Sequence, residues 1–105
     1  MILRLLLLPA LLLAAPALAQ PAVAPGTPYA AARDSLLRDG WAPLAVPDAD
    51  RCGPRDARCQ GRPEMVACAG TGEGHCLFAW TRQGQAIEVI TAGDPAVVTG
   101  MRARR

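Results

Sequence analysis

The chain has 105 residues, and its eleven basic and nine acidic residues give a formal net charge of +2. A domain of this length buries only about 60% to 65% of the surface that its unfolded chain exposes, so covalent cross-links would add useful stability. The near-neutral charge gives no electrostatic basis for binding nucleic acid. Length and charge therefore favour one small domain and argue against a nucleic-acid partner.

Residues 1–19 are typical of a secretory signal peptide. Arg4 lies near the N-terminus, and a leucine-rich apolar run follows it. The Ala-Leu-Ala sequence at 17–19 provides the small residues after which a signal peptidase cuts. The alternative is an uncleaved membrane anchor, but the apolar run is shorter than the roughly 20 residues that a spanning helix needs. We therefore expect a mature chain that begins at Gln20 and has no membrane span.

The mature chain is expected in an oxidising compartment, where cysteines form disulfides. All eleven basic residues are arginine and alanine is abundant, a bias typical of GC-rich bacterial coding sequences. This favours the bacterial periplasm, with an extracellular location as the alternative. The first cysteine is Cys52, too far from the cleavage site to carry a lipid anchor, so we expect a soluble monomer.

The mature chain divides into three parts. Residues 20–27 are rich in proline and alanine and carry no charge, a composition typical of a flexible tether. Residues 28–99 are predicted to form a single folded domain. Residues 100–105 contain three arginines and are expected to fray.

A helix is predicted over residues 28–39. Thr27 can cap its N-terminus, and Pro28 suits the first helical position, where a missing N–H group has no cost. Gly40 is a natural left-handed stop, and Trp41 can fold back onto the last turn. The apolar face is predicted to contain Tyr29, Ala32, Leu36 and Leu37, and the charged side chains expected to face away are Arg33, Asp34 and Arg38.

The rest of the domain has the pattern of β-strands. An extended segment at 41–46 contains Pro43, which confines it to a sheet edge. The polar stretch 47–62 is expected to form a surface loop. Strands are predicted at 64–69, 75–81 and 85–91, with a weak fourth strand at 96–99.

The second and third strands should form a hairpin, because Gln83-Gly84 between them fits a two-residue turn. That turn pairs bulky side chains on the face that the helix would cover. The inward pairs are Trp80 with Ile87 and Phe78 with Val89, and the outward pair is Leu77 with Ile90. The predicted fold class is therefore α+β, with one N-terminal helix packed on an antiparallel sheet of three to four strands and two disulfides as staples.

Four cysteines allow three disulfide pairings. Neighbour pairing joins Cys52 to Cys59 and Cys68 to Cys76. Crossed pairing joins Cys52 to Cys68 and Cys59 to Cys76. The loop-closure entropies of the two pairings are too similar to decide between them. Geometry favours neighbour pairing, because Cys68 and Cys76 flank one hairpin loop and can face each other across adjacent strands. The cysteine spacings lack the C-x-x-C pattern of thiol oxidoreductases, zinc sites and covalent haem. No metal or cofactor is expected.

No catalytic constellation stands out. The only serine, Ser35, lies in the predicted helix without a nucleophile elbow, and the only histidine, His75, is expected in solvent at the end of a hairpin loop. The Gly-Thr-Gly-Glu-Gly segment at 70–74 is similar to a phosphate-binding loop, but no helix or lysine follows it.

Other ligand sites are not indicated either. The carboxylates of Asp48, Asp50 and Asp56 lack the spacing of a calcium-binding loop. Trp41 and Trp80 are expected to pack in the core rather than to stack on a ligand. We therefore expect no enzymatic activity.

The helix that runs into Gly40-Trp41, the cysteine loop and the hairpin with Phe78-x-Trp80 resemble small uncharacterised exported, periplasmic proteins of proteobacteria. The resemblance spans most of residues 27–94 and implies a fold but no activity. More distantly, units of a helix and an antiparallel sheet occur in outer-membrane assembly lipoproteins and in β-lactamase inhibitor proteins. This chain lacks the lipid-acceptor cysteine of the former.

The leading hypothesis is a non-enzymatic exported protein that binds an unidentified protein partner in the cell envelope. Its interaction surface is expected on the open sheet face, with Leu77 and Ile90, or on the 47–62 loop, with Arg55 and Arg58. The alternative is an inhibitor of an exported hydrolase that presents the Cys52–Cys59 loop. A third hypothesis is a small hydrolase that uses His75.

Overall fold

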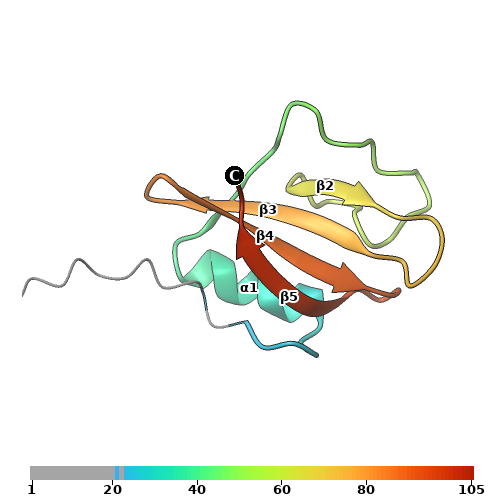
Figure 1. Cartoon of the computed structure of the whole chain (residues 1–105), viewed down its shortest axis with the longest axis horizontal. Helices are drawn as coiled ribbons and strands as arrows, with labels where there is room; N and C mark the ends of the chain where they lie inside the picture. The colour runs from blue at the N-terminus through green and yellow to red at the C-terminus, as the bar shows by residue number, and fades with distance from the viewer. Residues whose placement is uncertain (1–20, 22) are drawn as a thin grey trace, which may run out of the picture.

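The computed structural model describes Pro21 and residues 23–105. The predicted signal peptide and its cleavage site lie outside the described residues. Within them, one helix packs on a five-stranded antiparallel sheet (Figure 1). No helix in this part of the chain is long and apolar enough to cross a membrane. The elements are α1 (Tyr29–Arg38), β1 (Ala42–Pro43), β2 (Met65–Cys68), β3 (Cys76–Arg82), β4 (Gln85–Ala92) and β5 (Val97–Ala103).

The sheet confirms the α+β class but has five strands where three to four were predicted. The strand order is β1-β3-β4-β5, and β2 pairs with β3 as well. Consequently β1 and β2 share one edge of β3, with β1 beside Trp80 and Thr81 and β2 beside its first half. The additional strand arises because the proline-containing segment after the helix pairs with β3 over two residues.

Helix α1 begins one residue later than predicted, and Thr27 does not cap it. The Thr27 hydroxyl instead donates to a backbone carbonyl three residues earlier, at 2.7 Å, within the preceding turn. The predicted helix stop is confirmed, because Gly40 has a φ of +85° and the Trp41 N–H group donates to the Leu36 carbonyl at 3.0 Å. This Schellman arrangement ends the helix and turns Trp41 into the core.

The buried face of α1 differs from the predicted one at two positions. Leu37 is 43% exposed, whereas the Arg33 guanidinium binds a buried carboxylate. The helical repeat explains both differences. At about 100° per residue, Leu37 lies about 80° from the direction of Tyr29, and Arg33 lies only about 40° from it. Position around the helix therefore outweighs side-chain polarity here.

The hairpin of β3 and β4 has the predicted register. Gln83 and Gly84 have φ values of +50° and +77°, and a two-residue type I′ turn requires positive φ at both positions. The resulting pairs are Trp80 with Ile87, Phe78 with Val89 and Leu77 with Ile90. The side chains of the first two pairs are fully buried.

Strand β5 is longer than the strand predicted at 96–99, and it includes much of the tail that was expected to fray. Arg102 Nε and Arg104 Nη1 donate to the two carboxylate oxygens of Glu88, at 2.9 and 2.7 Å. These ion pairs tie the tail to β4. The folded domain therefore extends past residue 99.

The end of the predicted tether is also part of the fold. The Gly26 N–H group donates to the Val98 carbonyl and the Val98 N–H group donates to the Thr27 carbonyl, both at 2.8 Å. Val23 packs against the edge of the hydrophobic core. Residues 23–27 therefore continue the domain along the outer edge of β5.

The core lies between α1 and the sheet. The Tyr29 and Phe78 rings stack with 3.9 Å between their centroids, and Trp80 is fully buried. Trp41 is buried too, so both tryptophans are packing residues, as expected. Further buried apolar side chains are Ala32, Leu36, Met65, Ile87, Val89 and Val98.

A buried carboxylate sits inside this apolar core. Glu64 is fully buried and accepts hydrogen bonds from the Tyr29 hydroxyl at 2.7 Å and from Arg33 Nε at 2.8 Å. Arg33 Nη2 donates to the second oxygen at 3.2 Å. The indole Nε1 of Trp80 in turn donates to the Tyr29 oxygen at 3.1 Å. The four side chains form one hydrogen-bonded network between α1 and the sheet.

Alkaline titration tests this network. Burial, followed by the negative charge of Glu64, raises the pKa of the Tyr29 hydroxyl far above its ordinary value. The unfolded chain loses the same proton near pH 10, so the free energy of unfolding should fall by about 1.4 kcal/mol for each pH unit above that value.

The chain has one tyrosine and no lysine, so tyrosinate absorbance reports on this group alone. Absorbance and circular dichroism should change together, at a pH well above 10. A tyrosinate signal with a midpoint near pH 10 in a chain that is still folded would contradict the network. In a Tyr29→Phe variant, the free energy of unfolding should no longer fall with rising pH above about 10.

Candidate interaction site

Three connections meet at one end of the sheet. They are the loop between β1 and β2, the loop between β2 and β3, and the turn between β4 and β5. The Gly93 N–H group donates to the Glu73 carbonyl at 2.9 Å and joins the turn to the second loop. We call residues 53–58, 69–74 and 93–94 the loop cluster.

Two disulfides close the longer loops, with the neighbour pairing that hairpin geometry predicted. Cys52–Cys59 closes the first loop on itself. Cys68 and Cys76 are register partners on β2 and β3, 4.1 Å apart between their Cα atoms, and their bridge closes the second loop at its base. Two disulfides are consistent with an exported protein.

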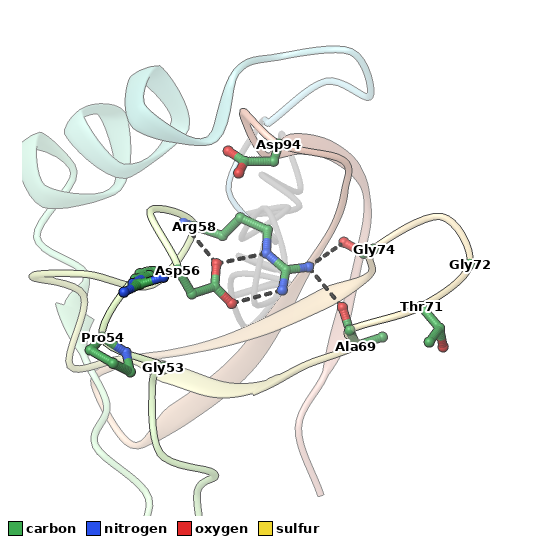
Figure 2. A pocket seen from close by; sticks show the side chains of 11 residues that line it. Gly53, Pro54, Asp56, Arg58, Ala69, Thr71, Gly72, Gly74 and Asp94 are labelled. Atoms are coloured by element: carbon green, nitrogen blue, oxygen red, sulfur yellow. Dashed lines mark hydrogen bonds and ion pairs between the residues drawn. The ribbon is translucent and has the colours of Figure 1, made fainter.

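Arg58 joins the two disulfide loops. Its Nε and Nη2 atoms donate to the two carboxylate oxygens of Asp56, at 2.8 and 2.7 Å. Its Nη1 atom donates to the carbonyls of Ala69, at 2.9 Å, and Gly74, at 3.2 Å. Figure 2 shows the guanidinium between the carboxylate on one side and the second loop on the other.

The position of Arg58 changes the role predicted for it. Its side chain is only 12% exposed, so it braces the loops from within and leaves little of itself for a partner. The Arg58 guanidinium also holds the pKa of the Asp56 carboxyl below its ordinary value, so both groups are charged and neutralise each other. Arg55, the other arginine expected at this surface, is exposed.

The loops surround a hollow of about 490 Å³ that is open to solvent. Its lining residues are Gly53, Pro54, Arg55, Asp56, Arg58, Ala69, Gly70, Thr71, Gly72, Gly74 and Asp94. Most of them are glycine, proline or alanine, so the walls are largely backbone. Arg55 and Asp94 are exposed, and neither forms an ion pair with another described residue. The hollow thus offers backbone groups, one cation and one anion.

Beneath the hollow, three potential metal ligands lie close together. A carboxylate oxygen of Asp56 and the Sγ atoms of Cys59 and Cys68 are all within 4.8 Å of one another. Both sulfurs are bonded in disulfides, whereas a cysteine binds a metal as a thiolate. The oxidised form therefore does not present these sulfurs as metal ligands.

The other predicted site residues lie outside the loop cluster, although His75 directly follows its second segment and lies beside Glu73. Leu77 and Ile90 pair on the face of the sheet opposite the core, where both are half-buried. The His75 imidazole is about half exposed and lies 3.4 Å from the Glu73 carboxylate. Ser35 on α1 accepts a hydrogen bond from Arg38 at 3.3 Å. The structure thus gives Ser35 and His75 different partners and does not bring them together.

Comparisons of the chain with family models, with curated proteins and with solved structures find no match. The chemistry of the site therefore has to be inferred from its own groups. Backbone N–H and C=O groups around an open hollow suit recognition of another polypeptide, whose backbone offers the complementary groups. Two free charges of opposite sign would orient such a ligand.

The contribution of Arg58 can be isolated with two matched glycine variants. Gly72 and Gly74 have nearly equal φ values, +66° and +63°, so alanine at either position should cost about 1 to 2 kcal/mol. A Cβ atom at Gly72 meets nothing within 4 Å, whereas one at Gly74 would lie 3.3 Å from Arg58 Nη1. That nitrogen is held by two carbonyls and cannot move without weakening both bonds.

Gly74→Ala should therefore lower the free energy of unfolding by at least about 1 kcal/mol more than Gly72→Ala, because a hydrogen bond to a charged group contributes about 1.5 to 3 kcal/mol. Urea denaturation of the oxidised proteins measures the difference. Equal losses would show that the guanidinium can move away without consequence.

Proposed function

We propose that this protein is an exported, non-enzymatic binding module that contacts a protein partner of the cell envelope through its loop cluster. The observation that carries the proposal is the Arg58 brace, which joins two disulfide-closed loops around an open hollow. Connecting loops that are held in a fixed shape suit recognition, because loops on a rigid scaffold present binding groups to a partner.

Rigidity supports binding in energetic terms. Association has to offset the entropy of ordering each flexible loop and side chain at the interface. Here two disulfides and the four hydrogen bonds of Arg58 hold the loops before any partner arrives. A partner segment in the hollow would contact mostly backbone groups, with Arg55 and Asp94 at its margins.

The open sheet face is the second candidate surface. Leu77 and Ile90 face outward there, but both are half-buried already and offer less apolar area than exposed side chains would. The same face carries the Glu88 carboxylate, whose two oxygens are already paired with Arg102 and Arg104. We therefore place the primary contact at the loop cluster.

An inhibitor of an exported hydrolase is the alternative function. It is favoured by Pro54 and Arg55, which are exposed in a loop closed by Cys52–Cys59 and braced by Arg58. A short exposed segment on a fixed base can enter an active site with little rearrangement, as in other preorganised inhibitor complexes. In this case the Arg55 side chain would enter the active site of the hydrolase.

Site-specific photocrosslinking tests the binding surface. A photoreactive residue in place of Arg55 or Thr71, on opposite loops of the hollow, should capture the same partner in cells that export the full chain. The matched control is Asp34, exposed on α1, which should capture nothing in common with them. Capture from Ile90 but not from Arg55 or Thr71 would move the contact to the open sheet face.

The captured partner separates the two functions. An envelope-assembly component would support the binding module. A hydrolase whose activity falls on stoichiometric addition of this protein, and recovers with Arg55→Ala, would support the inhibitor. Turnover of a substrate by the purified protein itself, lost in His75→Ala, would overturn both.

A further inference from the structure

The two disulfides are neighbours in space as well as in sequence. The Sγ atoms of Cys59 and Cys68, which belong to different bridges, lie within 4.8 Å of each other. A thiolate formed at Cys59 would therefore face the sulfur of an intact disulfide. Attack of a thiolate on a neighbouring disulfide sulfur is the elementary step of thiol–disulfide exchange.

We propose that Cys52 is a site of modification by low-molecular-weight thiols, and that this modification is relayed to the second disulfide. In the first step, an external thiolate attacks Cys52 Sγ, forms a mixed disulfide there and releases Cys59 as a thiolate. In the second step, the Cys59 thiolate attacks Cys68 Sγ, forms a Cys59–Cys68 bond and releases Cys76 as a thiolate, which takes up a proton. Each step forms one S–S bond and breaks one, so no separate oxidant or reductant is needed.

Accessibility leaves two sulfurs open to a first attack. Cys59 and Cys76 are buried, at 3% and 0% exposure, whereas Cys52 and Cys68 are both half-buried. The Gln60 side-chain amide lies 3.5 Å from the Cys52 sulfur in an exposed position. Attack at Cys68 would release Cys76 and stop there, whereas attack at Cys52 releases Cys59, the sulfur next to Cys68. The relay therefore starts at Cys52.

The sizes of the rings allow the second step to proceed in both directions. Residues 52–59 and 68–76 form rings of eight and nine residues, and a 59–68 bridge would form a ring of ten. The loop-closure entropy of a disulfide varies only with the logarithm of ring size, so these rings are nearly equivalent. The Cys68–Cys76 and Cys59–Cys68 bridges therefore differ little in loop-closure entropy, and both can be populated at equilibrium.

The exchange would rebuild the base of the loop cluster. The new bridge joins the first loop directly to β2, while the second loop loses the disulfide that closes it between β2 and β3. Because the relay needs only the four cysteines, it stands whether or not the loop cluster binds a partner. If the loop cluster does bind one, small thiols would alter that surface.

A single substitution isolates the second step. Cys52→Ser leaves Cys59 as a permanent thiol beside Cys68–Cys76, so exchange should begin without any added thiol. Acid quenching followed by peptic digestion should then show Cys59–Cys68 with free Cys76 in about a tenth to nine tenths of the molecules, since the rings are nearly equivalent. An intact Cys68–Cys76 bridge with free thiol at Cys59 alone would overturn the relay.

The matched control is Cys59→Ser. It leaves one free thiol at Cys52, which is not part of the group of ligand atoms around Cys68, so Cys68–Cys76 should stay intact. The same mapping applied to both variants thus compares two proteins with one free thiol each.

The wild-type protein supplies an independent test that does not depend on the folding of either variant. Treatment with millimolar reduced glutathione should give glutathione on Cys52, a Cys59–Cys68 bond and a free Cys76 thiol. Glutathione on Cys52 with the second bridge unchanged would overturn the relay, and glutathione on Cys68, on Cys76 or on no cysteine would overturn the choice of Cys52.

Discussion

The buried carboxylate of Glu64 is the constraint on which the rest of the fold depends. Its side chain holds α1 through Tyr29 and Arg33, and its backbone carbonyl accepts the Ala79 N–H group of β3 at 2.8 Å. A carboxylate without these partners would be strongly destabilising inside a core, at about 3 to 5 kcal/mol when one charged partner is removed. The helix can therefore occupy only the position that satisfies Glu64, and that position fixes the stacking of Tyr29 on Phe78.

Arginine acts as a cross-linking residue throughout this chain. Arg33 joins the helix to the start of β2, Arg58 joins two loops, and Arg102 joins β5 to β4. At the end of β3, Arg82 Nη1 donates a hydrogen bond to the carbonyl of Asp39, the C-terminal cap of α1, at 2.8 Å. The planar guanidinium offers several donors in a fixed geometry, which lysine does not. The formal net charge is only +2 because nine acidic residues offset the eleven basic ones, and within the described residues four of the arginines form ion pairs with those acids.

Most features that depend on a few neighbouring residues could be predicted from the sequence, whereas the polar contacts between distant residues could not. The Gly40 stop, the Gln83-Gly84 turn and both disulfides span at most nine residues, and all three agree with the structure. The partners Arg33 and Glu64 are 31 residues apart, and Arg58 is 16 residues from Gly74. No periodicity or spacing in the sequence marks such pairs. The candidate site was thus predicted as a loop and its cysteines, but not as two loops braced around a hollow.

The way the loop cluster uses its charges determines what it can recognise. Asp56 and Arg58 neutralise each other beneath the hollow, so neither contributes a net field to a ligand. Arg55 and Asp94 remain at the surface with opposite signs, and together they too add no net charge. Glu73, which is 80% exposed, leaves the loop cluster with a single net negative charge. Electrostatic steering over a distance grows with the net charge of one sign, and a single charge contributes little to it. Shape and backbone hydrogen bonding must therefore supply its selectivity, and both depend on the two neighbouring disulfides that hold the loops in place.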